Sequence, residues 1–154
     1  LFEEVKANMN DLMEDHDVKI EKNTLPTVAL VPLQFQQVFT NLISNSIKYS
    51  KPGIQPHIVI SATLTAGKEI ESLGANPSVN YWKISFEDNG IGFEQKYEKK
   101  IFELFHRLHG KNEYEGTGVG LGIVKKIILK HEGFIQATGK LGEGSVFDVY
   151  IPEN

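Results

Sequence analysis

The sequence predicts a single α+β domain, and three observations support this fold class. The length of 154 residues is that of one ordinary domain. Apolar residues recur at helical spacing in three segments, 1–15, 33–50 and 123–131. Shorter stretches between these segments alternate or are continuously apolar, which is typical of strands. No internal repeat and no linker divides the chain.

Six strands are expected between and after the helices. They cover residues 17–23, 27–31, 57–65, 81–88, 134–138 and 145–151. Residues 66–80 have no periodic pattern, so we expect a long and mobile connection between two strands of a hairpin. Gly133 is expected to end the helix at 123–131, and residues 139–144 form the turn of a closing hairpin.

The composition argues against several classes of function. A formal net charge of −4 disfavours a general nucleic-acid surface. The absence of cysteine excludes disulfides, thiol catalysis and Cys-ligated metals. No apolar run approaches the roughly 18 residues of a membrane span, so we expect a cytoplasmic domain. The chain opens inside an amphipathic pattern without Met, so we expect it to be part of a longer protein.

The apolar face of the strand 81–88 ends in a carboxylate, Asp88. A carboxylate that enters a core needs hydrogen-bond donors. Gly90 and Gly92 follow, and glycine lets a ligand approach the backbone closely. This combination suits a neutral ring with an exocyclic amino group, such as adenine. Taken alone, however, Asp-Asn-Gly more often marks a tight turn.

The helix over 33–50 carries two stripes. Its apolar stripe is Phe35, Val38, Phe39, Leu42, Ile43 and Ile47. Its polar stripe is Gln34, Gln37, Asn41, Asn45 and Lys48. Asparagine is a poor residue for a helix interior, and here two of them lie one turn apart. The polar stripe is therefore either a solvated face or a functional one.

Four glycines, at positions 116, 118, 120 and 122, lead from a polar loop into the helix at 123–131. Free N–H groups and the positive end of a helix favour phosphate at such a place. The P-loop spacing is absent. The dinucleotide fingerprint requires a strand directly before its first glycine, but residues 111–115, which stand there, are polar and do not form a strand pattern. A glycine-rich lid fits better, with 109–115 as its mobile part. The alternative is that the glycines only relieve close packing.

Four motifs taken together resemble those of the histidine protein kinases. Residues 41–50 resemble the N box, 88–93 the first glycine box, 102–105 the F box and 116–124 the second glycine box. They stand in the family's order, and residues 131–133 and 142–147 match its closing pattern. The resemblance implies the Bergerat ATP-binding fold, shared with gyrase, MutL and a heat-shock chaperone. That fold is a two-layer sandwich of about three main helices on one face of a mixed, mostly antiparallel sheet.

The resemblance also implies roles for individual residues around Mg-ATP. The nucleotide-contacting set is Asn45, Tyr49, Asp88, Gly90, Gly92, Phe93, Thr117, Gly118, Val119, Gly120 and Leu121. Asp88 would accept a hydrogen bond from the adenine amino group, and Asn45 would ligate Mg²⁺. The expected catalytic residues, acting near the phosphates, are Asn41, Lys48 and Arg107.

The same resemblance assigns the remaining contacts. Tyr49 would lie along the base, and Gly90 and Gly92 would form the backbone bed beneath it. Backbone N–H groups of the second glycine box would close over the phosphates. One departure concerns Leu104, which stands where many relatives carry arginine, so that Arg107 is the only arginine near the F box.

No histidine of this chain has the helical, acid-flanked setting of the family's phosphoacceptor. The five are His16, His57, His106, His109 and His131. We therefore expect residues 1–154 to be the catalytic domain alone, without the phosphoacceptor and dimerisation domain. It would transfer the γ-phosphoryl group of ATP to a histidine on that helical domain, with a response regulator downstream. The parent protein would be a membrane-associated homodimer of the inner membrane, and this fragment a monomer.

Two other functions remain open within the same superfamily. One is an anti-sigma-type serine kinase, and the other is a nucleotide-binding regulatory module without transferase activity. Gyrase-like ATPases carry a catalytic glutamate one turn before the Mg²⁺-binding asparagine. Asn41 stands at that place here, which argues against autonomous ATP hydrolysis.

Overall fold

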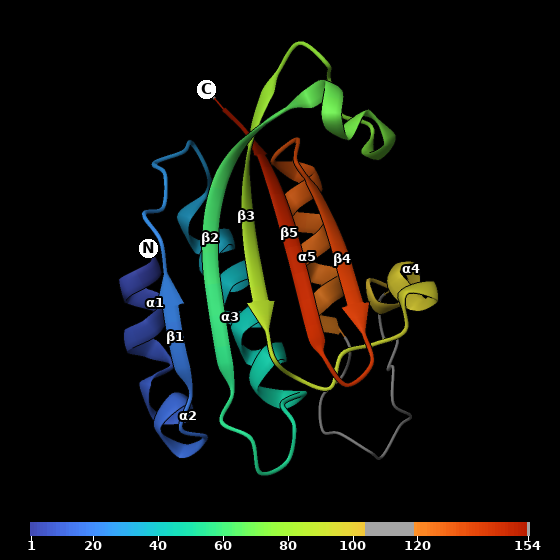
Figure 1. Cartoon of the computed structure of the whole chain (residues 1–154). Coiled ribbons are helices and arrows are strands. Elements are labelled where there is room, and N and C mark those ends of the chain that lie inside the picture. The colour runs from blue at the N-terminus through green and yellow to red at the C-terminus, as the bar shows by residue number, and fades with distance from the viewer. Residues whose placement is uncertain (104–118, 154) are drawn as a thin grey trace.

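The computed structural model describes residues 1–103 and 119–153, which form a five-stranded sheet with helices packed against it (Figure 1). The helices are α1 (Phe2–Asn8), α2 (Asn10–Asp15), α3 (Pro32–Lys48), α4 (Glu98–Ile101) and α5 (Val119–Lys130), with 3-10 helices η1 (Gly67–Leu73) and η2 (Gln95–Tyr97). The strands are β1 (Lys19–Lys22), β2 (His57–Ala66), β3 (Asn80–Asp88), β4 (Phe134–Lys140) and β5 (Gly144–Pro152). Within this part of the chain, no helix has the length and apolar character needed to cross a membrane.

The sheet is mixed and mostly antiparallel, as predicted. Its strand order is β1-β2-β3-β5-β4, in which only β1 and β2 pair in parallel. The central strand β3 ends at Asp88, which lies between Ile58 of β2 and Ser145 of β5 in the register. The carboxylate that ends β3 is therefore flanked on both sides by neighbouring strands.

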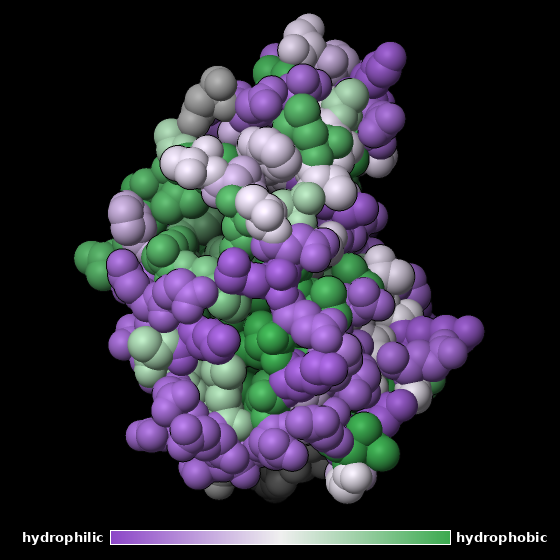
Figure 2. Space-filling view, turned by 60° about the vertical axis from the view of Figure 1, so that its left-hand side comes forward, coloured by the Kyte–Doolittle hydropathy of each residue, from purple (hydrophilic) through white to green (hydrophobic). Residues whose placement is uncertain are grey.

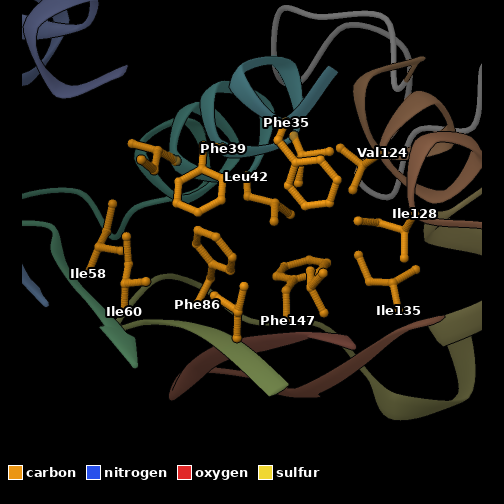
Figure 3. Close-up of a cluster of buried hydrophobic side chains, with 14 of the residues drawn as sticks. Phe35, Phe39, Leu42, Ile58, Ile60, Phe86, Val124, Ile128, Ile135 and Phe147 are labelled. Atoms are coloured by element: carbon orange, nitrogen blue, oxygen red, sulfur yellow. The ribbon is translucent and has the colours of Figure 1, made fainter. Parts of the chain in front are cut away.

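The core lies between the sheet and the helices α3 and α5, which cover one face (Figures 1 and 3). Figure 3 shows Phe35, Phe39 and Leu42 of α3 and Val124 and Ile128 of α5 pointing toward Phe86, Ile135 and Phe147 of the sheet. The rings of Phe39 and Phe86 meet edge to face, with 5.1 Å between centroids. The whole predicted apolar stripe of α3 is buried. Because a buried phenylalanine contributes several kcal/mol, truncating Phe86 to alanine should cost about 3–5 kcal/mol.

The N-terminal helix predicted over residues 1–15 is divided in two at Met9. This residue has φ −101° and ψ 8°, outside the helical range. Asparagines on both sides, at positions 8 and 10, are weak helix formers, which accounts for the break. Phe2, Val5, Met9 and Met13 nevertheless remain buried on one side. Figure 2, which turns this side of the molecule forward, shows a mostly hydrophilic surface with a hydrophobic patch at its upper left and smaller ones near its centre and lower right.

The prediction of a strand over residues 27–31 is wrong. This segment pairs with no described strand, and Val28 and Leu30 are half-buried against the core instead. The backbone N–H of Val31 donates to Nε2 of His131, 3.0 Å away, rather than to a neighbouring strand. The apolar pattern thus reflected packing, not sheet pairing. The strand predicted over 17–23 is confirmed in the shorter form of β1.

The expected connection between β2 and β3 is present, but it is not without structure. It contains η1, and Gly67 N–H donates to the Val79 carbonyl oxygen at 2.7 Å. Ile70 and Ala75 are buried in a small separate cluster with Tyr81 and Tyr150. These apolar contacts cover one end of the sheet. They involve so few residues that no periodic pattern in the sequence predicts them. The mobility of this segment stays a prediction.

The helix α5 does not end in the way that was predicted. Glu132, not Gly133, has the left-handed conformation after the helix, with φ 60°. Gly133 N–H donates to the Ile128 carbonyl oxygen at 3.0 Å, as in a common helix-ending motif. Glycine is needed at position 133 for another reason: an added Cβ would lie 2.1 Å from the Tyr150 carbonyl oxygen.

Candidate functional site

The carboxylate of Asp88 is buried at the end of β3 and is held by donors from three segments. The Ser46 hydroxyl of α3 donates to Oδ2 at 2.9 Å, and the Gly90 N–H donates to Oδ1 at 2.9 Å. The backbone of Ser145 is a further donor. Burial raises the pKa of Asp88, while these hydrogen bonds oppose the rise. The result is a pre-positioned acceptor of the kind that an exocyclic amino group requires.

Ser46 is a site residue to which the sequence analysis gave no role. It is only 4% exposed, and it lies one helical turn after Leu42, on the apolar side of α3. A buried hydroxyl needs a partner, and the carboxylate of Asp88 supplies it. The available signal was a polar residue placed within an otherwise apolar stripe.

Gly90 and Gly92 are required by the protein's own backbone. A Cβ on Gly90 would lie 2.5 Å from the Tyr49 carbonyl oxygen, and one on Gly92 would lie 2.1 Å from that of Lys140. Gly92 also has φ 70°, which favours glycine. Ligand approach is the reason that the sequence suggests for both glycines, whereas the structure shows that each fits closely against the protein's own backbone, at the end of α3 and at the β4–β5 turn. The bed beneath the base remains a prediction.

Phe93 lies in the core rather than on an open surface. Its side chain is 4% exposed, and its ring packs so closely on Gly139 that a Cβ there would lie 2.5 Å from it. The structure therefore gives Phe93 a supporting role: it fixes the backbone of residues 88–93 against β4. Direct contact with a nucleotide, as expected from the sequence, has no support from this position.

Asn41, in the polar stripe of α3, faces the first turn of α5. Asn41, Asn45 and Lys48 are all half-buried. The Asn41 Nδ2 lies 3.4 Å from the Gly120 carbonyl oxygen, which brings together two residues predicted to act near the phosphates. Lys48 Nζ lies 6.0 Å from the centroid of the Tyr49 ring at the end of the helix.

The residues present fit a magnesium ion that is held mostly by phosphates. Among the described residues, no group of three His, Asp or Glu side chains could hold a metal. The side-chain amide of Asn45 forms no hydrogen bond with any residue in 1–103 or 119–153, so its oxygen is available. Mg²⁺ prefers oxygen ligands, keeps several waters, and commonly takes one or two ligands from the protein.

The helix α5 presents its N-terminal end to this region. Val119, Gly120 and Leu121 are the first residues of this helix that the structure describes, and backbone N–H groups at the start of a helix have no partner within it. Such groups, with the helix dipole, favour anions. Arg107, Thr117, Gly118 and the lid predicted over 109–115 lie outside the described residues.

The two halves of the site are joined by one helix. Ser46, which holds Asp88, and Asn41, which contacts Gly120, are five residues apart on α3. They are therefore separated by about 7.5 Å along the helix axis. An amino-bearing base on Asp88 and phosphates beside Asn41 and α5 would lie at the two ends of this interval.

Comparison with known proteins agrees with this geometry. The family described as histidine kinase-, DNA gyrase B- and HSP90-like ATPase matches residues 30–154. Cyanobacterial phytochrome A of Nostoc sp. is 38% identical over 147 residues, which cover 95% of this chain and 17% of that protein. Phytochrome-like protein Cph1 of Synechocystis sp. is 37% identical over 146 residues, covering 95% of this chain and 18% of the relative. The chain thus spans less than a fifth of these relatives.

Two solved structures share the fold. The mycobacterial sensor histidine kinase MprB superimposes with a TM-score of 0.74 at 20% identity, covering 98% of this chain and 93% of that one. Full-length ShkA in complex with AMPPNP gives a TM-score of 0.73 at 22% identity, covering 97% of this chain and 28% of ShkA. The family match over residues 30–154 shows that the chain belongs to the histidine kinase-, DNA gyrase B- and HSP90-like ATPase family. Its relatives, which include a sensor histidine kinase of Burkholderia thailandensis that is 34% identical over 119 residues, make it an ATP-binding catalytic domain of the sensor histidine kinase type.

Proposed function

We propose that this chain binds Mg-ATP and donates the γ-phosphoryl group to a histidine on a separate helical dimerisation domain. The observation that carries the proposal is the buried Asp88 carboxylate, which accepts hydrogen bonds from Ser46 of α3 and from Gly90. The same helix places Asn41 beside the first turn of α5. Asp88 accepts from the adenine amino group, and Tyr49 borders the base. Asn41, Lys48 and the first turn of α5 position the phosphates.

Magnesium would be held by Asn45 together with the phosphates. When bound, it would neutralise negative charge on the transferred phosphoryl group. The protein's own contribution is positioning, because phosphoryl transfer needs little covalent help from side chains. The described residues provide that positioning through rigid elements: α3 lies on the core, and the first turn of α5 contacts it through Asn41. Arg107 stays a predicted phosphate contact.

Transfer to another domain is favoured over autonomous hydrolysis. The helix α3 contains no aspartate or glutamate, so it offers no carboxylate that could activate water near the phosphates. His131 is not a suitable acceptor, because its Nε2 accepts from the Val31 N–H and its Nδ1 lies 2.8 Å from the Ile127 carbonyl oxygen. Both ring nitrogens of this histidine are therefore occupied within the fold.

The partners follow from the same proposal. The acceptor domain belongs to the same kinase, and a response regulator receives the phosphoryl group from it. The lengths of the similar phytochromes support further domains, since this chain matches less than a fifth of each. The cytoplasmic location, the dimeric and membrane-associated parent, and the monomeric state of this chain stay predictions.

Phosphotransfer in trans tests the proposed function. The chain is incubated with labelled Mg-ATP and with the helical acceptor domain of its parent protein. We expect an acid-labile phosphoprotein on the partner and only slow release of phosphate by the chain alone. An acid-stable product would favour the serine-kinase alternative, and nucleotide binding without any transfer would favour a regulatory module. Rapid phosphate release by the chain alone would overturn the kinase assignment.

A further inference from the structure

The side chain of Asn89, which stands between Asp88 and Gly90, holds a separate segment of the chain. Its Oδ1 accepts a hydrogen bond from the His57 N–H at 2.9 Å, and its Nδ2 donates to the Gln55 carbonyl oxygen at 3.0 Å. Both ends of the amide are thus used on backbone groups at the start of β2. This pairing of one acceptor with one donor is specific to a carboxamide.

The segment held in this way is residues 49–56, the connection from α3 to β2. The next two residues after Asn89 fix its other end. Gly90 packs against the Tyr49 carbonyl oxygen, and the Ile91 N–H donates to that oxygen at 2.9 Å. Three consecutive residues therefore fasten the connection at both ends, and the first of them does so through its side chain.

We propose that Asn89 is a positioning residue for the base half of the nucleotide site. Its hydrogen bonds to the backbone of Gln55 and His57 keep the α3–β2 connection, which includes Tyr49, beside Asp88. This inference rests on the proposed function, because it takes the base to lie between Tyr49 and Asp88. Asn89 acts through backbone groups and need not touch the nucleotide.

The structure confines the effect of Asn89 to the base half. Its contacts are with residues 55 and 57, whereas the phosphate half is formed by Asn41, Asn45, Lys48 and the start of α5, to none of which the Asn89 side chain is hydrogen-bonded. Losing two partly exposed hydrogen bonds should weaken binding of a base-containing ligand about fivefold to tenfold. Aspartate cannot replace Asn89, because a carboxylate oxygen would then face the Gln55 carbonyl oxygen.

Three ligands separate the two halves of the site: adenosine for the base, inorganic tripolyphosphate with Mg²⁺ for the phosphates, and Mg-ATP for both. Their affinities are measured by NMR titration for the wild-type chain, Asn89→Ala and Asn89→Asp. Asn76→Ala is the matched control. Its Oδ1 also accepts a backbone N–H, from Ser78 at 2.8 Å, but in the β2–β3 connection.

We expect both Asn89 variants to bind adenosine and ATP more weakly by the same factor, with unchanged affinity for tripolyphosphate. Asn76→Ala should change none of the three. Unchanged adenosine affinity in Asn89→Ala would overturn the proposal, and so would an equal loss for tripolyphosphate, which indicates a general structural role. If the wild-type chain binds neither adenosine nor ATP, the proposed function itself is wrong and the positioning role falls with it.

Discussion

The two halves of the site are built in different ways. In the base half, the Asp88 carboxylate is 9% exposed and both of its oxygens accept hydrogen bonds from the protein. In the phosphate half, Asn41 and Asn45 are half-buried, and the hydrogen bond between Asn41 and Gly120 is long at 3.4 Å. The acceptor of the base half is thus held in position before a ligand binds. The phosphate half has polar side chains that can still bind metal and phosphate. Such preorganisation on one side reduces the ordering cost of binding there.

The largest loss of ATP affinity is expected from a substitution in the base half. Asp88→Asn replaces an acceptor oxygen by a donor facing the adenine amino group. A buried mismatch of this kind costs about 1–3 kcal/mol, or roughly fivefold to 150-fold in affinity. Titration of a fluorescent ATP analogue measures the loss. A folded Asp88→Asn variant that binds ATP as tightly as wild type would show that the base does not use this carboxylate.

The same residue gives a prediction on pH. Because burial raises the pKa of Asp88, the folded chain binds this proton at a higher pH than the unfolded chain does. The contribution of Asp88 to the free energy of unfolding is therefore greatest at acid pH and is lost as pH rises through the folded pKa. ATP affinity should change in the opposite sense, since an ionised carboxylate is the stronger acceptor. Chemical denaturation and ATP titration across acid and neutral pH, with Asp88→Asn as the reference, test both trends.

The phosphate half is tested with Asn45→Ala. We expect this variant to fold normally, because Asn45 is on the polar stripe and its truncation leaves no core cavity. Magnesium should no longer tighten ATP binding, since the one proposed protein ligand is gone. ATP titrations with Mg²⁺ and with EDTA measure the difference. An equal effect of Mg²⁺ on the variant and on wild type would place the metal on another residue.

A smaller effect is expected from Ser46→Ala, which removes one donor to Asp88. Loss of a single hydrogen bond to a buried carboxylate should weaken ATP binding by about 1.5 kcal/mol, or roughly tenfold. Ser44→Ala is the control, because residue 44 lies two positions earlier on α3 and so about 200° around the helix. Calorimetric titration of both variants gives the comparison. Equal losses in the two would mean that the hydroxyl of Ser46 has no particular role.

No effect on ATP binding is expected from Glu132→Gly, which lies just after the C-terminal end of α5. Glu132 has φ 60°, and glycine avoids a cost of about 1 kcal/mol for this conformation. The melting temperature should rise by about 2–4 °C for a chain of this size. ATP affinity should stay the same, which would separate general stability from the preorganisation of the base half. A lower melting temperature would show that the Glu132 side chain stabilises the native state by other means.

The sequence predicted those parts of the molecule in which spacing reports directly on structure. The apolar stripe of α3 and the strand ending at Asp88 were identified because their periods match a helix and a strand. Residues 27–31 were misassigned because an irregular segment that packs on the core has the same apolar composition as a strand. The roles of Ser46 and Asn89 depend on contacts over 42 and 32 residues of sequence, and no local pattern encodes such distances.

The helix α3 connects the two halves of the site, and this has a consequence for how the chain tolerates insertions and deletions. Each residue added to an α-helix turns everything after it by about 100° and shifts it by about 1.5 Å. One residue inserted between Asn41 and Ser46 would carry the Ser46 hydroxyl away from Asp88 while Asn41 kept its place beside Gly120. The length of this interval is therefore fixed more strictly than the identity of most residues within it. Homologous recombination or design that joins fragments inside α3 must preserve the interval residue for residue.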